Sequence, residues 1–161
     1  MEKKLKVLVV ENELDFVNLA RSALECSSYQ VVTASDRKGG MEIARKESPV
    51  LIIMGALEPQ GKAFRLYREL RDCCGTQNIP LLVVDVRPEE HWQKGWTRDE
   101  GIQMDAEDYV PRPIEPAELV RSVEKILERV TWRRTRDSSV VLDRMEEALI
   151  RVDTLKASLV K

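Results

Sequence analysis

The stretch Leu5-Lys6-Val7-Leu8-Val9-Val10, which runs directly into Glu11-Asn12-Glu13, decides the fold class. The run is short, apolar and rich in β-branched side chains, and polar residues end it at once. Such a run is typical of a strand that is buried on both faces of a parallel sheet. We therefore expect a strand over residues 5–10 whose carboxyl end carries polar side chains.

Further apolar runs alternate with helical patterns along the chain. Short runs at 29–34, 50–54, 79–84 and 108–110 predict four more strands. Helices are predicted at 14–24, 36–47, 64–70 and 116–130, and the segment 87–104, which contains prolines and glycines, predicts a short or broken helix. Alternating strands and helices imply an α/β fold with a doubly wound parallel sheet of five strands, followed by a C-terminal helix.

Composition excludes several classes of function. The 161 residues carry 26 Lys and Arg against 28 Asp and Glu, so the net charge of -2 gives no global attraction to nucleic acid or membrane. The longest uncharged apolar run, 50–57, is far shorter than the roughly 20 residues of a membrane span, and no signal peptide precedes it. Three cysteines, two of them adjacent, favour a reducing cytoplasm.

The single histidine, His91, excludes histidine-rich metal sites and most arrangements of a nucleophile with a histidine base. We expect His91 to lie in a solvated loop or at a helix start. The sequence therefore predicts a protein that is not an enzyme and that has neither a metal site nor another cofactor.

Polar residues gather at the ends of the predicted strands. Because the carboxyl ends of parallel strands meet at one edge of the sheet, functional groups are expected there. The residues at these ends are Glu11, Asn12, Glu13, Gly55, Asp85 and Arg112.

In order and spacing, residues 4–130 resemble the receiver domain of two-component response regulators. The resemblance is carried by Val7-Leu8-Val9-Val10-Glu11-Asn12-Glu13, by Pro49 to Gly55 with Pro59 and Phe64, by Ile79-Pro80 to Val86, and by Asp108 to Pro113. It implies a flavodoxin-like sheet with the strand order 2-1-3-4-5. It also implies a place in signal transduction or a phosphorelay.

In that family an aspartate at the end of the third strand accepts a phosphoryl group, and acidic residues after the first strand hold magnesium. A hydroxyl and a lysine after the fourth and fifth strands contact the phosphate. The matching residues here are Gly55, then Glu11 and Asn12, then Asp85 and Arg112. Since Gly55 has no side chain to phosphorylate, we expect a pseudo-receiver with a vestigial site. Tyr109 matches the family's aromatic switch position.

Two hypotheses describe the altered cluster. In one, the cluster only packs and is solvated after the loss of phosphorylation. In the other, Asp85 and Arg112 form an ion pair across the space left by Gly55, which fixes one conformation and holds Tyr109 in place, because arginine suits a bidentate contact to a carboxylate. A weaker alternative makes Asp85 itself a phosphoacceptor.

The C-terminal part has its own pattern. We divide the chain into a receiver-like domain at 1–131, a basic linker at 132–139 in which Ser138 or Ser139 could cap a new helix, and an amphipathic helix at 140–161. The helix has an apolar seam with coiled-coil spacing, made of Val141, Met145, Ala148, Val152, Leu155 and Leu159. A lone helix of this length is marginal in water, so the seam must be covered by a second copy, by the chain's own domain or by a partner protein. We favour a homodimer.

The leading function is thus an atypical receiver module that signals through contacts with a protein partner, independently of phosphorylation. The alternative is a transcription regulator or DNA-associated protein that uses the basic segment 129–136. Glu128 and Asp137 interrupt that segment, and no helix-turn-helix pattern follows it, which favours the first function.

Overall fold

The computed structural model describes residues 2–160, and its elements follow the predicted alternation. They are β1 (Lys6–Val10), α1 (Leu14–Cys26), β2 (Gln30–Ala34), α2 (Arg37–Glu47), β3 (Leu51–Met54), α3 (Lys62–Asp72), β4 (Leu81–Val84), the 3-10 helix η1 (Pro88–Glu90), α4 (Arg98–Gln103), β5 (Asp108–Val110) and α5 (Pro116–Leu159). The expected broken helix over 87–104 is present as η1 and the six-residue α4.

The five strands form one parallel sheet in the order β2-β1-β3-β4-β5, which confirms the predicted flavodoxin-like topology. In its register, Val10 pairs with both Ala34 and Met54, and Val84 pairs with Val110. The strands therefore end at nearly the same level, and the residues that follow them share one edge of the sheet.

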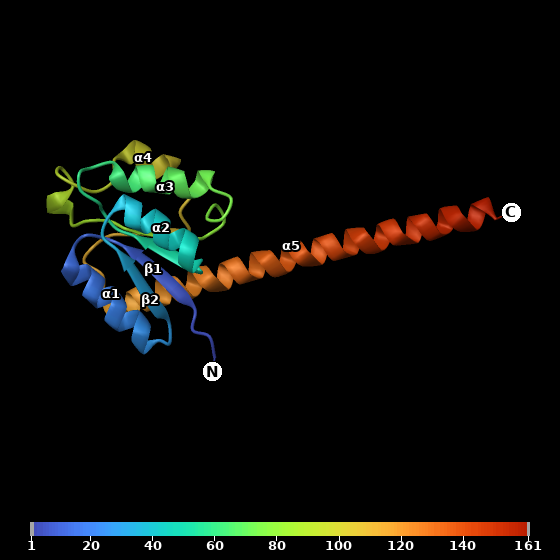
Figure 1. The fold of residues 1–161 in the computed structure, drawn as a ribbon, viewed down its shortest axis with the longest axis horizontal. Coiled ribbons are helices and arrows are strands. Elements are labelled where there is room, and N and C mark those ends of the chain that lie inside the picture. Colours follow the sequence, from blue (N-terminus) through green and yellow to red (C-terminus); the bar gives the residue numbers. More distant parts are fainter. Residues whose placement is uncertain (1, 161) are drawn as a thin grey trace. The chain divides into compact units, whose positions relative to one another are not determined.

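Helices cover both faces of this sheet, with α2, α3 and α4 on one side and α1 with the first turns of α5 on the other (Figure 1). Alternate strand residues point to opposite faces. One core cluster packs Leu8, Ile52 and Val83 against side chains of α2 and α3, among them Met41 and Leu66. On the opposite face, α1 and α5 contribute fully buried side chains such as Leu24 and Ile126.

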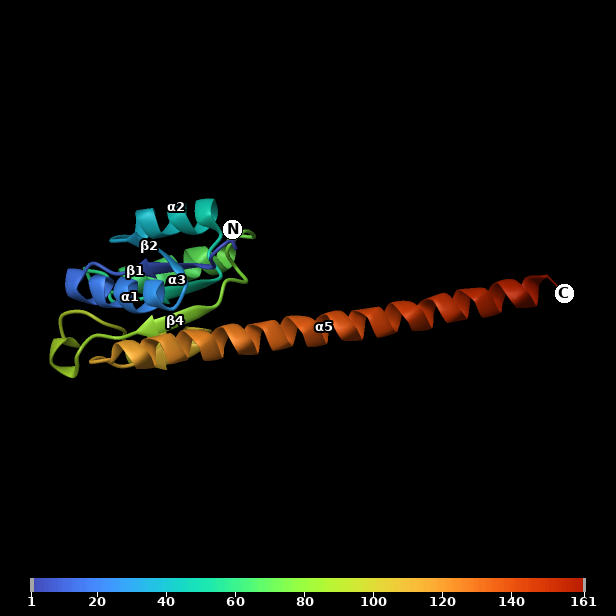
Figure 2. The same ribbon diagram turned by 90° about the horizontal axis from the view of Figure 1, so that it is seen from below.

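The chain divides into two compact units after Leu127, and α5 belongs to both. Figure 2 shows α5 as one continuous helix. The residues of the predicted basic linker, 132–139, are helical, and the new helix start expected at Ser138 or Ser139 is wrong. Interior serines cost a helix only about 0.5 kcal/mol each, whereas a second start requires a second nucleation step.

Within residues 2–160, no helix combines the length and apolarity that a membrane span requires.

Candidate functional site at the carboxyl edge of the sheet

The structure brings Glu11, Gly55 and Arg112 together at the carboxyl edge of the sheet. Glu11 follows β1 directly, Gly55 follows β3 and Arg112 lies two residues beyond β5. The backbone N–H of Gly55 donates to the carbonyl of Val10 at 2.9 Å, which holds the ends of β1 and β3 together. Asn12 is exposed, and its backbone N–H donates to Glu11 Oε1 at 2.7 Å.

A buried ion pair joins the first of these residues to the last. Arg112 Nη2 donates to Glu11 Oε2, and the two side chains are only 6% and 2% exposed. The other oxygen of Glu11 accepts hydrogen bonds from the backbone N–H groups of Asn12 and Glu13. Every oxygen of this buried carboxylate therefore has a donor, which a buried charge requires.

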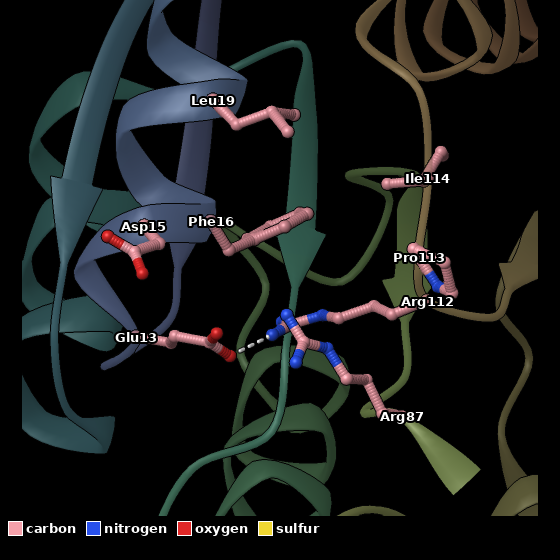
Figure 3. A pocket seen from close by; sticks show the side chains of 8 residues that line it. All are labelled: Glu13, Asp15, Phe16, Leu19, Arg87, Arg112, Pro113 and Ile114. Carbon is pink, nitrogen blue, oxygen red and sulfur yellow. Dashed lines mark hydrogen bonds and ion pairs between the residues drawn. The ribbon is translucent and has the colours of Figure 1, made fainter.

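The guanidinium of Arg112 has further contacts on the side of α1. Nη1 donates to Glu13 Oε2 at 2.6 Å, and the guanidinium carbon lies 4.2 Å from the centre of the Phe16 ring, a cation-π distance. Figure 3 shows Arg112 directed toward Glu13, with Phe16 beside it and Arg87 on the wall of the same small pocket. Because two carboxylates and an aromatic ring hold one guanidinium, its position is strongly determined.

The side chains of Glu11 and Arg112 fill the space next to Gly55. A Cβ added to Gly55 would lie 2.7 Å from the carboxyl carbon of Glu11 and 2.9 Å from Arg112 Nη2, and closer still to Glu11 Oε2. Real Cβ atoms do not approach other atoms so closely. A side chain at position 55 would therefore require the carboxylate of Glu11 and the guanidinium of Arg112 to move, because their ion pair occupies the space that it would need.

The predicted ion pair between Asp85 and Arg112 is wrong. Arg112 is engaged by Glu11 and Glu13 instead, and Asp85 has its own partners. The physical reason is reach: the longer side chain of Glu11 brings a carboxylate over Gly55, and its charge neutralises the guanidinium there.

Asp85 is the centre of a second cluster, on the side of η1 and β5. Its Oδ1 accepts the backbone N–H of Val86 at 2.8 Å, and the hydroxyl of Tyr109 donates to its Oδ2. Nε2 of His91 lies 2.7 Å from the same Oδ2, so this histidine is not simply a solvated loop residue as expected. The buried carboxylate thus ties the segment after β4 to the middle of β5.

Tyr109, the candidate switch residue, is half exposed and held through its hydroxyl. Partial burial and then the hydrogen bond to the Asp85 carboxylate raise the pKa of the Tyr109 hydroxyl above its ordinary value. The carboxylate therefore keeps the phenol protonated and fixes the ring's direction.

Sequence reasoning missed two residues of these clusters, Phe16 and His91. Glu13 was expected at the carboxyl edge but was given no partner, and Phe16 was one of several apolar residues on α1. His91 reaches Asp85 because η1 turns the chain back after Arg87, and the segment between β4 and His91 carries no periodic signal. Among residues 2–160, no group of three His, Cys, Asp or Glu side chains is arranged to hold a metal ion.

The predicted seam residues all lie on α5, in the second unit. Their side chains are exposed, as are the flanking apolar residues Leu142, Leu149 and Ile150. A continuous apolar surface on a helix is unfavourable in water and indicates a contact surface.

No family model matches the chain. Similar proteins include the alkaline phosphatase synthesis transcriptional regulatory protein PhoP of Bacillus subtilis, which is 32% identical over 124 residues that make up 77% of this chain and 49% of PhoP. The phosphate regulon transcriptional regulatory protein PhoB of Escherichia coli is 27% identical over 78% of this chain and 53% of PhoB. The chain spans about half the length of these two curated relatives.

Solved structures have the same fold. The chemotaxis response regulator CheY4 of Vibrio cholerae is 20% identical with a TM-score of 0.65, and the match covers 77% of this chain and 99% of CheY4. A putative response regulator from Chloroflexus aurantiacus is 24% identical with a TM-score of 0.67, over 78% of this chain and 99% of that one. These structures share the fold, and the sequence similarity to PhoP and PhoB, together with the strand order, identifies a response-regulator receiver domain in this chain.

Proposed function

We propose that the chain is a receiver module that works without phosphorylation at the usual site and signals through contacts with other proteins. The observation that carries this proposal is the ion pair beside Gly55. The usual acceptor position has no side chain, and Glu11 and Arg112 fill the space that one would occupy. Glu11 is also one of the two residues at the family's magnesium positions, and a buried guanidinium already neutralises it.

The two clusters support a fixed rather than a switched conformation. In a phosphorylated receiver, new charge at the site has to reposition nearby groups. Here two carboxylates are already present, and each accepts a hydrogen bond: Glu11 from Arg112, and Asp85 from Tyr109. Both contacts join different segments of the chain, so they stabilise one conformation of the edge of the sheet without added charge.

Intact mass tests this proposal directly. The chain is incubated with acetyl phosphate and magnesium, and a receiver domain that has the acceptor aspartate serves as the positive control. We expect the control to gain the mass of one phosphoryl group and this chain to gain none. Any phosphoryl adduct on this chain would contradict the proposal, and its loss in Asp85→Asn would identify Asp85 as the acceptor.

We also propose that the chain forms a homodimer through the second unit. The exposed seam on α5 supports this, because three heptads of apolar surface need a cover. Light scattering on the whole chain should give the mass of a dimer, and a chain that ends at Arg136 should be a monomer. In the full-length chain, Leu155→Asp places a charge in the seam and should have the same effect, whereas Asp143→Asn, outside the seam, should leave the dimer intact.

A second candidate function is a transcription regulator or DNA-associated protein. It is favoured by the exposed arginines within 129–136 and by the transcriptional regulators among the relatives. Neutralised phosphates make DNA binding strongly dependent on salt. A shift of duplex DNA that weakens steeply between low and physiological salt, and that is lost in Arg134→Gln with Arg136→Gln, would support this function over the first.

A further inference from the structure

The small pocket beside Arg112 has an apolar end and a charged end. Its volume is about 130 Å³, and it lies between α1, the segment after β4 and the loop that joins β5 to α5 (Figure 3). We propose that this pocket binds a small organic carboxylate whose apolar part is about the size of a benzene ring. The inference goes beyond the proposed function, because it gives the module a ligand of defined chemistry.

The apolar end of the pocket is formed by two separate segments. Phe16 and Leu19 line it from α1, and Pro113 and Ile114 line it from the loop before α5. Phe16 is only 6% exposed and Ile114 only 7%, so the packing around these side chains fixes them. A cavity of about 150 Å³ that is lined by apolar side chains holds benzene. The apolar end therefore suits one aromatic ring or a short branched chain.

The guanidinium groups of Arg87 and Arg112 lie together at the charged end (Figure 3). Arg112 already binds the carboxylates of Glu11 and Glu13. Arg87 is exposed, and within residues 2–160 its guanidinium takes part in no hydrogen bond or ion pair. These two arginines and two glutamates have no net charge, so the cluster as a whole does not repel an anion. The donors of Arg87 are free to bind a carboxylate through two parallel hydrogen bonds.

A second donor at this end has no acceptor. Arg112 Nε is buried and lacks a hydrogen-bond partner in the described part of the chain, and the whole side chain is only 6% exposed. Buried N–H groups without an acceptor are rare, because each costs free energy. The other two nitrogens of this guanidinium bind Glu11 and Glu13. The acceptor that is missing at Nε therefore points to a bound molecule with an oxygen atom at this place.

The sign of the ligand's charge follows from the groups that remain available. Two carboxylates line the pocket, those of Glu13 and Asp15. Glu13 Oε2 accepts from Arg112 Nη1 at 2.6 Å, and in Figure 3 the carboxylate of Asp15 is directed away from the Phe16 ring. Neither carboxylate is well placed to bind a cation inside the pocket. Free donors together with engaged acceptors favour an anionic ligand.

A bound carboxylate would connect three segments of the receiver domain. Its apolar part would contact α1 and the loop before α5, and its carboxylate would contact Arg87 after β4. Ile114 lies two residues before Pro116, where α5 begins. A ligand that binds only the folded chain stabilises it. Occupation of the pocket would therefore hold the start of α5 against α1.

A titration of the full-length chain with benzoate tests the proposal. Benzoate should shift the amide signals of Phe16, Leu19 and Ile114 in proton–nitrogen NMR spectra to saturation, and the Nε–H signal of Arg112 should shift with them. Acetate lacks the ring and benzyl alcohol lacks the carboxylate, so each should bind about tenfold more weakly or less. Benzylamine, with a cation on the same ring, should bind more weakly than benzoate.

Two variants locate the site. Arg87→Gln removes the exposed guanidinium and should weaken benzoate binding by about tenfold or more. Arg68→Gln is the matched control, because Arg68 is an exposed arginine on α3, on the opposite face of the sheet, and its loss should leave the affinity unchanged. Leu19→Trp fills the apolar end with an indole ring and should abolish the saturable shifts.

Several outcomes would overturn the proposal. If benzoate gives no saturable shift at Phe16, Leu19 and Ile114 up to its solubility limit, water is the acceptor for Arg112 Nε and the pocket has no carboxylate ligand. Tighter binding of benzylamine than of benzoate would show that the acidic residues select the ligand. Equal weakening in Arg87→Gln and Arg68→Gln would assign the binding to general surface charge. None of these results bears on phosphorylation, which the acetyl phosphate experiment decides separately.

Discussion

Arg112 and Glu11 are 101 residues apart in the chain, and yet they form a buried ion pair directly beside Gly55. The pair connects the end of the first strand to the loop after the last one, across the middle of the sheet. It therefore links the earliest and the latest parts of the receiver domain, and several measurable properties depend on it.

Adding a methyl group at position 55 should destabilise the receiver domain. Gly55→Ala puts a Cβ against Glu11 and Arg112, and overpacking of this kind costs about 1–3 kcal/mol. Gly101→Ala is the matched control, because a Cβ there meets no atom within 4 Å and alanine favours the helix α4 by about 0.5–1 kcal/mol. Urea unfolding of the two variants should give shifts of opposite sign. Equal shifts would contradict the tight contact at Gly55.

Removing the positive charge of Arg112 should lower the free energy of unfolding more than replacing its guanidinium with an ammonium group. Arg112→Met leaves the Glu11 carboxylate buried without its cationic partner, and breaking a buried pair in this way costs about 3–5 kcal/mol. Arg112→Lys keeps the charge but cannot donate to Glu11 and Glu13 in the same fork, so its loss should be smaller. Adding Glu11→Gln to Arg112→Met removes the isolated charge and should recover part of the loss in the unfolding free energy.

Tyr109 should resist ionisation. Its hydroxyl has a raised pKa because of partial burial and the hydrogen bond to Asp85, so the folded state binds this proton more tightly than the unfolded chain does. The associated stability is complete below the ordinary tyrosine pKa of about 10 and is lost as the pH rises from there through the raised pKa of the folded state. The tyrosinate absorbance of the chain, compared with that of Tyr109→Phe, should show no contribution from Tyr109 near pH 10. Asp85→Ala should bring that contribution back only in part, because the partial burial of Tyr109 remains, and it should quicken amide exchange at Val86.

Cys73 should react at lower pH than an ordinary thiol. The backbone N–H of Gly75 and, to a smaller degree, the side chains of Arg45 and Thr76 lower the pKa of the Cys73 thiol. The rate of alkylation by iodoacetamide, followed by peptide mass, should therefore rise at lower pH for Cys73 in the folded chain than for Cys73 in the urea-unfolded chain. Arg45→Ala should move the profile of the folded chain upward only in part, because the Gly75 contact remains. Identical pH profiles for Cys73 in the folded and unfolded chains would contradict this account.

The strands could be predicted closely because buried parallel strands are continuous apolar runs. The run that starts at Leu5 ends in the structure at Val10, as expected, and the run over Asp108–Val110 matches β5 without a shift. Burial on both faces leaves no alternative pattern for such short runs. The place where the polar side chains gather followed from the same strands, since their ends meet at one edge of the sheet. The interpretation of these residues as a vestigial phosphorylation site came from the resemblance to receiver domains and stays a prediction.

The partners within the site could not be predicted in the same way. Three residues with carboxylates, Glu11, Glu13 and Asp85, follow strand ends near Arg112. The length and direction of each side chain decide which carboxylates bind the guanidinium, and these are the carboxylates of Glu11 and Glu13. His91 approaches Asp85 through a short 3-10 turn that leaves no periodic pattern in the sequence. At Ser138 and Ser139 the capping preference of serine predicted the start of a new helix. The helical segments on both sides override this preference, and α5 continues through both residues.

The crowding at Gly55 also makes the order of mutations matter. A chain that acquires aspartate at position 55 while Glu11 is unchanged places a second carboxylate against the first and against the guanidinium that holds it. Shortening Glu11 first removes the closest of these contacts, and an aspartate can then be introduced with less crowding. A carboxylate at position 55 therefore requires two substitutions in a set order, and one substitution alone is disfavoured.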